Sequence, residues 1–368
     1  MSRFWAPVVR SLTPYTPGEQ PRGDNLLKLN TNENAFPPSD AVMTAITSTS
    51  GEELLRYPDP LCSELRVSAA QVHGIDPSQV FAGNGSDEVL AHVFQALLKH
   101  GKAPLLMPDI SYSFYPVWTQ LFDVDYRTVP LGDDFSIRVG DYQSPDSHVL
   151  LANPNAPTGM AISAASIRSL LDSSPERLVV IDEAYVDYGA ESVVPLIRDY
   201  DNLLVVQTLS KSRALAGLRV GFAFGDRSLI EGLERVKDSF NSYPLDLLAQ
   251  KAATAALNDE LWFQRTRDEV IRVRTWFESE LRHLGFSPLP SQANFVFAEH
   301  SVLEGRLLFD RLRERGIIVR RWDKPRIENY LRISIGTEEQ MQRVRKALAE
   351  IVGDALETPG SAGYQGQA

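Results

Sequence analysis

The sequence has very little cysteine, and this excludes several kinds of protein. Cys62 is the only cysteine in 368 residues, so a disulfide within the chain and a zinc–cysteine cluster are both excluded. The six histidines are scattered without the spacing of metal ligands. No apolar run reaches the roughly 18 residues that a membrane-spanning helix requires. We therefore expect neither a metal site nor a membrane segment.

An excess of basic residues is also absent. The net charge of −11 at pH 7 argues against a broad nucleic-acid-binding surface. The N-terminus has no charged segment followed by an apolar run of the signal-peptide type. The composition is otherwise ordinary for a globular protein, with 43% hydrophobic and 23% charged residues. These features predict a cytoplasmic protein without nucleic-acid or membrane partners.

The length of 368 residues exceeds that of one compact domain, so we expect two domains. Residues 1–40 are rich in proline, asparagine and glycine, which favours an extended N-terminal arm. We expect a large domain over residues 41–255 and a smaller α+β domain over residues 256–355, together with part of the arm. Residues 356–368 end in GSAGYQGQA, which predicts a disordered tail.

Short apolar strands alternate with helical segments through the first two thirds of the chain. Strands are expected within residues 79–83, 103–109, 125–131, 148–154, 177–185 and 202–210. A largely helical stretch covers residues 228–283, and beyond it we expect strands within 293–299 and 330–336 and helices within 307–316 and 338–352. This order predicts an α/β fold whose mostly parallel central sheet is covered by helices on both faces.

Four of the expected strands end in polar residues, and sites in open α/β sheets form at the carboxyl ends of strands. Residues 83–88 (GNGSDE) follow one strand, where glycines let the backbone approach an anion and a helix N-terminus supplies N–H donors. The same residues also fit a plain helix cap formed by Ser86 and Asp87. Residues 153–159 (NPNAPTG) follow another strand and offer amide donors, although they equally fit an ordinary turn.

The other two strand ends carry an acid and a lysine. Asp182 ends a buried strand, where a carboxylate is costly without a cationic or hydrogen-bonding partner. A protonated pyridine nitrogen is one such partner, and a metal ion is the alternative, but no histidine lies close by in the sequence. Lys211 is either an exposed loop charge or a partly buried, nucleophilic amine, as Schiff-base formation requires. Arg219 follows it and suits bidentate phosphate binding.

The features at these strand ends, with Arg219, would all be explained by one kind of ligand. An anion cradle, an amide loop, a buried acid, a strand-end lysine and a phosphate-binding arginine together fit a phosphorylated aromatic aldehyde. We therefore expect pyridoxal 5′-phosphate (PLP) as the cofactor.

At these motifs the chain resembles the fold-type I PLP enzymes of the aspartate aminotransferase superfamily, over nearly its whole length. Within them it is most similar to the histidinol-phosphate aminotransferase family, of class II. The shared motifs are LNTNENAFPP, RYPD, GNGSDE, PNAPTG, VIDEAY, TLSKSRALAGLRVGF, SYPLDLLAQ and LRISIGT. TLSK followed by LAGLRVG is the most specific, whereas GNGSDE and the PTG loop are shared more widely. The resemblance implies a large PLP-binding domain and a smaller α+β domain.

The resemblance also implies a role for each matching residue. Lys211 forms the Schiff base with the cofactor and later moves a proton between Cα and C4′. Asp182 pairs with the pyridinium nitrogen, Tyr185 donates to the phenolic O3′, and Tyr112 stacks on the ring. The phosphate is held by the backbone of Ser86 and Asp87 and by Thr208, Ser210 and Arg219.

One position departs from the superfamily. An asparagine usually precedes Pro-Thr-Gly and shares O3′ with the tyrosine, but this chain has Ala156 there. Asn153 and Asn155 are the remaining candidates, and we assign the contact to Asn155.

Substrate recognition is implied for a second set of residues. Tyr57 of RYPD would reach the phosphate in the neighbouring subunit, which implies a homodimer with active sites at its interface. Arg332 matches an arginine that binds the substrate's anionic group, and Arg320 matches a second phosphate-binding arginine. Arg321 is an equally cationic neighbour, and a solvated loop charge is the alternative for either assignment. The residues expected to line the imidazole side are Tyr15, Asn32 and Tyr243.

The implied activity is transfer of the amino group of L-histidinol phosphate to 2-oxoglutarate, which gives imidazole-acetol phosphate and L-glutamate in histidine biosynthesis. The alternatives on the same fold are an aromatic amino-acid aminotransferase and a decarboxylase of threonine phosphate. A PLP-domain regulator without turnover is disfavoured, because only an arm of about 40 residues without a helix-turn-helix pattern precedes the large domain.

Overall fold

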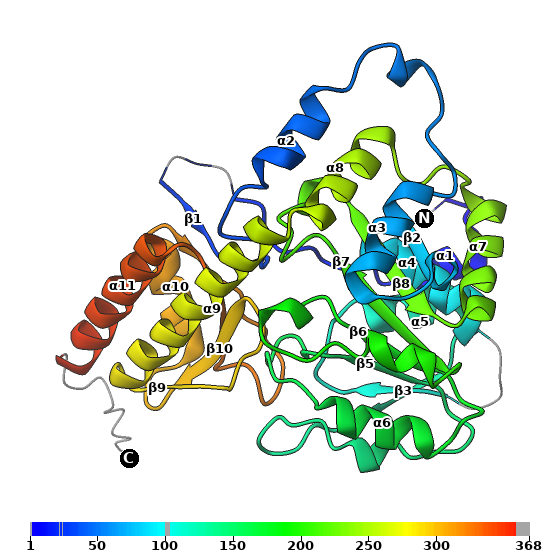
Figure 1. Ribbon diagram of the computed structural model, residues 1–368. Coiled ribbons are helices and arrows are strands. Elements are labelled where there is room, and N and C mark those ends of the chain that lie inside the picture. The colour runs from blue at the N-terminus through cyan, green and yellow to red at the C-terminus, as the bar shows by residue number, and fades with distance from the viewer. Residues whose placement is uncertain (1, 22, 24, 100–103, 358–368) are drawn as a thin grey trace. The chain divides into compact units, whose positions relative to one another are not determined.

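The computed structural model describes residues 2–21, 23, 25–99 and 104–357 (Figure 1). The chain forms two compact units. Unit 1 takes in the chain up to Pro17, Glu33–Ile271 and Pro290–Asn294, and unit 2 takes in Gly18–Asn32, Arg272–Leu289 and the chain from Phe295 onward. The domain limits expected at residues 41 and 256 stay predictions, and the expected tail lies outside the described residues beyond Glu357.

Unit 1 contains a seven-stranded sheet in the order β2-β8-β7-β6-β5-β3-β4. All neighbouring strands are parallel except at β8, which is antiparallel to both β2 and β7. The mostly parallel sheet is therefore confirmed, with one reversed strand. The strands are β2 Val80–Asn84, β3 Leu105–Pro108, β4 Tyr126–Val129, β5 Val149–Ala152, β6 Val179–Asp182, β7 Leu203–Thr208 and β8 Val220–Gly225.

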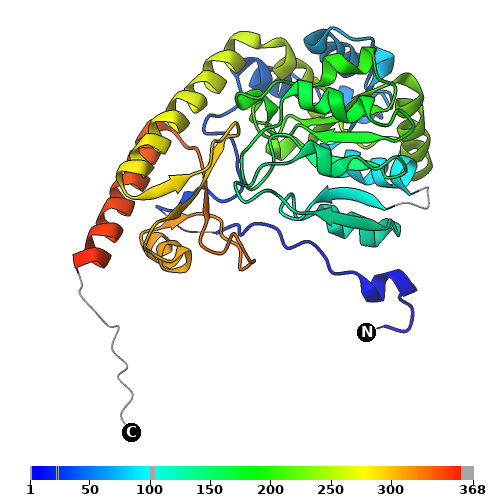
Figure 2. The same ribbon diagram turned by 90° about the horizontal axis from the view of Figure 1, so that it is seen from below.

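Helices cover both faces of this sheet, and the strand residues alternate between two cores (Figures 1 and 2). In β6, for example, Val179 and Ile181 pack in one core, whereas Val180 packs in the other. The first core includes α2 Asp40–Thr47, α3 Ser63–His73, α6 Ala164–Asp172 and α8 Leu247–Asn258, and the second includes α4 Gly85–Val93, α5 Tyr115–Phe122 and α7 Arg227–Phe240. By the same alternation Asp182 faces the second core.

Polar residues define where several of these helices begin. Ser39, Ser163 and Asp246 each accept a hydrogen bond from a backbone N–H in the first turn of the helix that follows. Such caps satisfy N–H groups that have no acceptor within the helix. The remaining helices of the described chain are α1 Pro7–Ser11, α9 Glu260–His283, which runs from unit 1 into unit 2, and α10 and α11 of unit 2.

Unit 2 is built from two small sheets and helices. Its antiparallel sheet has the order β12-β10-β9, with β9 Phe286–Pro288, β10 Phe295–His300 and β12 Leu331–Ser334. Its helices are α10 Gly305–Glu314 and α11 Glu338–Glu357. β1 Leu27–Lys28 pairs in parallel with β11 Ile317–Ile318.

Some details differ from the sequence-based expectations. The arm at residues 1–40 is not extended throughout, because it contains the short helix α1. β8 was not predicted at all, although it pairs with both β2 and β7 in the large sheet. No helix in the described ranges has the length and apolar character that would let it cross a membrane.

Candidate active site

Strand register brings the predicted site residues of unit 1 to one edge of the large sheet. β2, β6 and β7 run in the same direction, so their carboxyl ends share this edge, and β8 begins there. Gly221 of β8 pairs with Gly83 on one side and with Thr208 on the other. The start of α4, the lysine loop after β7, and Arg219 before β8 are therefore neighbours.

Glycines make the close approach at this edge possible. A Cβ on Gly221 would lie 2.4 Å from the backbone nitrogen of Ser86, and a Cβ on Gly85 would lie 2.5 Å from Nη2 of Arg219. Gly85 also has a φ of +81°, which disfavours any other residue. The first N–H groups of α4 lack acceptors within the helix and carry positive potential. With the Arg219 guanidinium beside them, they form an anion cradle.

Asp87 links two other side chains beside the cradle, Arg219 and Tyr112. Arg219 Nη2 lies 2.9 Å from Asp87 Oδ2, and the Tyr112 hydroxyl donates to Asp87 Oδ1 at 3.0 Å. On the other side of β8, Thr208 Oγ1 donates to Ser210 Oγ at 2.8 Å. The structure thus brings together the five residues that we expect to hold the cofactor's phosphate within one subunit, which are Ser86, Asp87, Thr208, Ser210 and Arg219.

Asp182 lies at the end of β6 and is only 5% exposed. Its Oδ2 accepts a hydrogen bond of 2.7 Å from the hydroxyl of Tyr115, and its Oδ1 accepts one of 3.1 Å from the backbone N–H of Ala184. Burial raises the pKa of Asp182 to about 6, against the opposing effect of these donors and of Lys211. A cationic ligand group beside this carboxylate would stabilise its charged form.

Lys211 follows β7 and is half-buried, in a loop that is anchored on several sides. Asn34 Nδ2 donates to the carbonyl oxygens of Lys211 and Ser212, at 2.9 and 3.1 Å. The hydroxyl of Ser212 donates to Asp187, and the buried Arg213 donates to the Ala256 carbonyl at 2.8 Å. These contacts hold the backbone around Lys211 in place.

Two aromatic residues expected at the site also lie in unit 1. Nζ of Lys211 is 5.7 Å from the ring centre of Tyr185, which follows β6. Tyr112 belongs to an aromatic cluster in which its ring meets that of Tyr115 edge-on, with 5.4 Å between centres. Tyr15 joins this cluster by stacking on Phe114 at 4.7 Å.

The asparagines of the NPNAPTG loop are both buried and both bound to protein groups. Asn155 Nδ2 donates to the Ile110 carbonyl at 3.0 Å and approaches Thr158 Oγ1 at 3.3 Å, while its Oδ1 accepts from Ser111. Asn153 pairs with the backbone of Ile162. These bonds explain a rigid loop, and the contact between Asn155 and O3′ stays a prediction.

In unit 2, two predicted arginines lie opposite each other. Arg320 and Arg332 form an antiparallel bridge with backbone hydrogen bonds of 2.8 and 3.0 Å. Both guanidinium groups lie over the ring of Trp322, with their carbons 5.5 and 5.2 Å from its centre. The neighbouring Arg321 is bound to Asp323 and to the Glu328 carbonyl instead. Arg320, rather than Arg321, therefore accompanies Arg332.

Asn32, which we expected beside the substrate, is fully buried within unit 2. Its Oδ1 accepts from the hydroxyl of Ser334 at 2.8 Å, and its backbone N–H donates to the same hydroxyl at 3.0 Å. These contacts tie Asn32, the last residue of segment Gly18–Asn32, to β12 of unit 2. A contact between Asn32 and the substrate stays a prediction.

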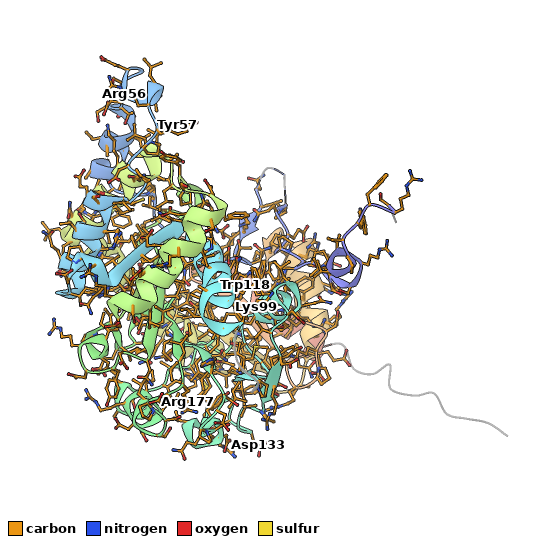
Figure 3. The ribbon with its side chains drawn as sticks, turned by 90° about the vertical axis from the view of Figure 1, so that its right-hand side faces the viewer. Arg56, Tyr57, Lys99, Trp118, Asp133 and Arg177 are labelled. Atoms are coloured by element: carbon orange, nitrogen blue, oxygen red, sulfur yellow. The ribbon has the colours of Figure 1, made fainter. Side chains whose placement is uncertain are left out.

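Tyr57 and Tyr243 form a pair on the surface of unit 1. Their rings stack with 4.7 Å between centres, and Tyr57 is 81% exposed. Figure 3 shows Arg56 and Tyr57 near the outer end of this unit. Tyr57 is thus available to a neighbouring molecule.

Sequence reasoning missed two residues of this site, Tyr115 and Asn34. Tyr115 lies among the aromatic residues that follow β3, and only the fold shows that its hydroxyl reaches Asp182, 67 positions away. Asn34 belongs to the ENAF motif, and its contact with the lysine loop spans 177 positions. Neither contact leaves a signal in local sequence.

The residues present fit PLP. The glycine-lined cradle suits its phosphate, the buried Asp182 suits a protonated ring nitrogen, and Lys211 suits its aldehyde. Among the residues that the structure describes, no group of His, Cys, Asp and Glu side chains could hold a metal ion.

Comparisons with known proteins agree with this geometry. The family model described as aminotransferase class I and II matches residues 24–348. Histidinol-phosphate aminotransferase 1 of Bradyrhizobium diazoefficiens is 56% identical over 352 residues, which cover 96% of this chain and 100% of that protein. Histidinol-phosphate aminotransferase 1 of Bordetella parapertussis is 53% identical over 354 residues, covering 95% and 99%.

Solved structures show the same fold. The crystal structure of histidinol-phosphate aminotransferase from Sinorhizobium meliloti in complex with pyridoxal-5′-phosphate has a TM-score of 0.85 at 25% identity, covering 96% of this chain and 99% of that chain. Aspartate aminotransferase of Thermus thermophilus has a TM-score of 0.80 at 20% identity, covering 95% and 100%, a likeness of fold alone.

Proposed function

The chain belongs to the class I and II aminotransferase family, and from this premise we propose that it is a PLP-dependent histidinol-phosphate aminotransferase of histidine biosynthesis. The reaction transfers the amino group of L-histidinol phosphate to 2-oxoglutarate and yields imidazole-acetol phosphate and L-glutamate. The observation that carries the proposal is that one edge of the large sheet holds Ser86, Asp182, Lys211 and Arg219. The chain is also 52–56% identical to enzymes named histidinol-phosphate aminotransferase.

PLP supplies an electrophilic aldehyde and an electron-withdrawing ring. The chain's own residues do the rest. The cradle at the start of α4 would bind the phosphate with Arg219, and Asp182 would hold the proton of the ring nitrogen. Tyr185 would donate to O3′. Nζ of Lys211 would accept the proton from the substrate's Cα, and the hydrogen bonds that anchor its loop would hold the lysine backbone in place for this step.

The substrate's phosphate would bind to the two arginines of unit 2. L-Histidinol phosphate has no α-carboxylate, so its phosphate would take the place of an anionic group beside Arg332. Arg320 lies across the bridge from it and adds a second positive charge. Arginine guanidinium groups bind phosphate and carboxylate in the same forked geometry, so 2-oxoglutarate would use this site in the second half of a ping-pong cycle.

A panel of substrates tests this function. Purified protein is given PLP and 2-oxoglutarate with L-histidinol phosphate, phenylalanine or threonine phosphate, and glutamate and carbon dioxide are measured. We expect glutamate to form fastest with histidinol phosphate. Faster transfer from phenylalanine would favour an aromatic aminotransferase, and release of carbon dioxide from threonine phosphate would favour a decarboxylase.

The enzyme is further proposed to act as a homodimer in which Tyr57 completes the partner's site. Exposed apolar side chains lie close in the sequence to Tyr57 or to its stacking partner Tyr243, which supports burial against a second copy. Leu54, Leu55, Leu61, Tyr243 and Phe240 are 58%, 82%, 51%, 42% and 78% exposed.

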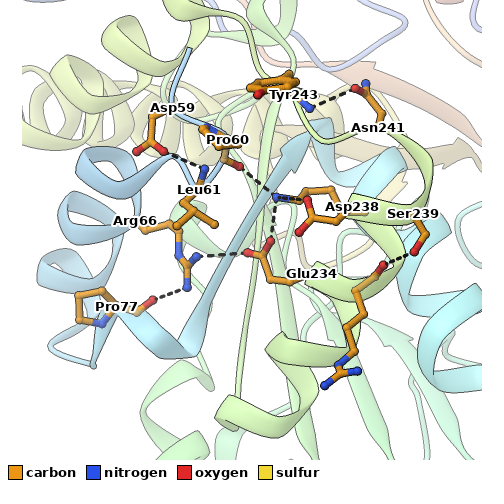
Figure 4. A network of polar contacts seen from close by, with 12 residues as sticks. Asp59, Pro60, Leu61, Arg66, Pro77, Glu234, Asp238, Ser239, Asn241 and Tyr243 are labelled. Atoms are coloured by element: carbon orange, nitrogen blue, oxygen red, sulfur yellow. Dashed lines mark hydrogen bonds and ion pairs between the residues drawn. The ribbon is translucent and has the colours of Figure 1, made fainter. Parts of the chain in front are cut away.

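The segment that carries Tyr57 is held firmly, as an interface element should be. Lys237 is only 2% exposed, and its Nζ donates to the Pro60 carbonyl at 3.0 Å while pairing with Glu234 at 2.8 Å (Figure 4). Arg66 binds the other oxygen of Glu234 at 3.2 Å. This network ties the backbone at Pro60, three positions after Tyr57, to α7.

Mixed dimers test the shared site. Lys211→Ala and Tyr57→Ala subunits are each expected to be nearly inactive, but a mixture that exchanges subunits should regain activity, because one of its two sites has both residues intact. A mixture that exchanges subunits without regaining activity would contradict a shared site. A protein that stays monomeric in sedimentation would contradict the dimer itself.

A cytoplasmic location is also proposed. It is supported by a single cysteine that is buried, and burial raises the pKa of Cys62 to about 12, which keeps it unreactive. Cell fractionation with antibody detection tests the location, and recovery outside the cytoplasm would contradict it.

A further inference from the structure

The hydroxyl of Tyr115 meets a carboxylate that the proposed chemistry needs in its charged form. Tyr115 is the first residue of α5, is 1% exposed, and donates to Asp182 Oδ2 at 2.7 Å. Its ring is held edge-on by Tyr112, so the hydroxyl has little freedom to turn elsewhere. Burial keeps the pKa of Tyr115 well above its ordinary value, so the group stays a hydrogen-bond donor.

The surroundings of Asp182 act in opposing directions. Burial has the largest effect and raises its pKa, and the nearby carboxylate Asp87 of α4 raises it further. The hydrogen bonds from Tyr115 and from the Ala184 backbone lower it, as does the Lys211 charge. Of the two hydrogen bonds to Asp182, the one from Tyr115 comes from a side chain and the other comes from the backbone.

We propose that Tyr115 is a positioning residue for the cofactor: its hydroxyl holds Asp182 ionised and oriented, so that Asp182 keeps the proton on the ring nitrogen of PLP. The inference rests on the proposed PLP chemistry and adds a residue to it. Each carboxylate oxygen can accept about two hydrogen bonds. Tyr115 and Ala184 use one position on each oxygen, which leaves room for the ring N–H.

Binding of the cofactor to the apoprotein tests the inference without turnover. The dissociation constant of PLP is compared with that of an analogue whose ring nitrogen is replaced by carbon. Tyr115→Phe removes the hydrogen bond from the hydroxyl to the charged Asp182. We therefore expect this variant to bind PLP on the order of tenfold or more weakly than the wild-type protein, with little change in its affinity for the analogue. Tyr142→Phe is the matched control, because the Tyr142 hydroxyl is also buried but has no hydrogen-bond partner among the residues that the structure describes.

Stability of the apoprotein gives a second readout. Asp182 has a folded pKa of about 6 against 3.8 when unfolded, so its ionisation costs folding free energy as pH rises through this range. Removing the Tyr115 donor raises the folded pKa further, so the extra loss of stability in Tyr115→Phe should grow above pH 6. A purely structural role for the hydroxyl would give a loss that does not depend on pH.

The outcomes separate this inference from the proposed function. If wild-type protein prefers PLP to the analogue and Tyr115→Phe keeps that preference, the inference is wrong and the PLP site stands. If wild-type protein binds neither molecule, the proposed function itself is wrong. If Tyr115→Phe does not fold, Tyr115→His, which retains a donor, should restore the preference for PLP, and a folded Tyr115→His without that preference would overturn the inference.

Discussion

Gly221→Ala is expected to damage the phosphate end of the site. An added Cβ would lie 2.4 Å from the backbone nitrogen of Ser86 and 2.5 Å from the carbonyl carbon of Gly85. Both are main-chain atoms at the start of α4, so no side-chain rotation can relieve the clash. Either β8 or the first turn of α4 must move, and the N–H donors of the cradle move with that turn.

The magnitude follows from two costs. Overpacking in a close-packed interior typically costs about 1–3 kcal/mol of folding free energy. Displacing N–H groups from a phosphate loses hydrogen bonds to a charged group, each worth about 1.5–3 kcal/mol, so PLP should bind roughly 10- to 100-fold more weakly. Pyridoxal has no phosphate, and its weaker binding should change much less.

The assay is titration of the apoprotein with PLP and with pyridoxal, followed by absorbance, together with urea unfolding. Gly217→Ala is the control, because a Cβ there has no atom within 4 Å and Gly217 lies only four positions away. Equal losses of PLP and pyridoxal affinity in Gly221→Ala, or no loss of either, would refute a phosphate cradle at α4.

Three further changes have distinct expected results. Arg332→Lys should raise the KM for histidinol phosphate about tenfold or more, since lysine cannot form the forked contact. Arg321→Ala, which loses its bonds to Asp323 and to the Glu328 carbonyl, should keep the wild-type KM, and equal effects of the two changes would contradict the assignment. Gly353→Ala in α11 adds a methyl group into open space and should raise the free energy of unfolding by about 0.5–1 kcal/mol in urea titration, and a loss would contradict this. Burial raises the pKa of the Glu183 carboxyl from 4.5 to about 7. Between these pH values the unfolded chain has released this proton while the folded protein still holds it, so the free energy of unfolding should fall as the pH rises, by up to about 1.4 kcal/mol per pH unit. Glu183→Gln should lack this pH dependence, and a variant with the wild-type pH profile would refute the assignment to Glu183.

Much of the large sheet could be predicted because its aliphatic strands end abruptly in polar residues. Asp182 and Lys211 were recognisable for this reason, and parallel strands then bring their carboxyl ends to one edge. β8 escaped prediction because it follows Arg219 without a turn residue. Arg219 itself takes a left-handed φ of 55°, which a glycine or asparagine would have signalled and an arginine does not.

Contacts between distant parts of the chain could not be predicted. The bond from Tyr115 to Asp182 depends on how α5 packs on β6, and no local pattern encodes that packing. The choice between Arg320 and Arg321 depends on backbone pairing, because Arg320 forms the isolated bridge to Arg332 of β12. Both arginines are equally good candidates in the sequence, and only the backbone pairing with Arg332 distinguishes them.

The most direct test of the account is a single half-reaction. PLP-loaded protein is mixed with L-histidinol phosphate in the absence of 2-oxoglutarate, and the cofactor's absorbance is followed. We predict that the cofactor is converted once, to its amine form, with one equivalent of imidazole-acetol phosphate per active site, and that Lys211→Ala does neither. No conversion by histidinol phosphate, in protein that is converted by phenylalanine or another amino acid, would contradict the assignment.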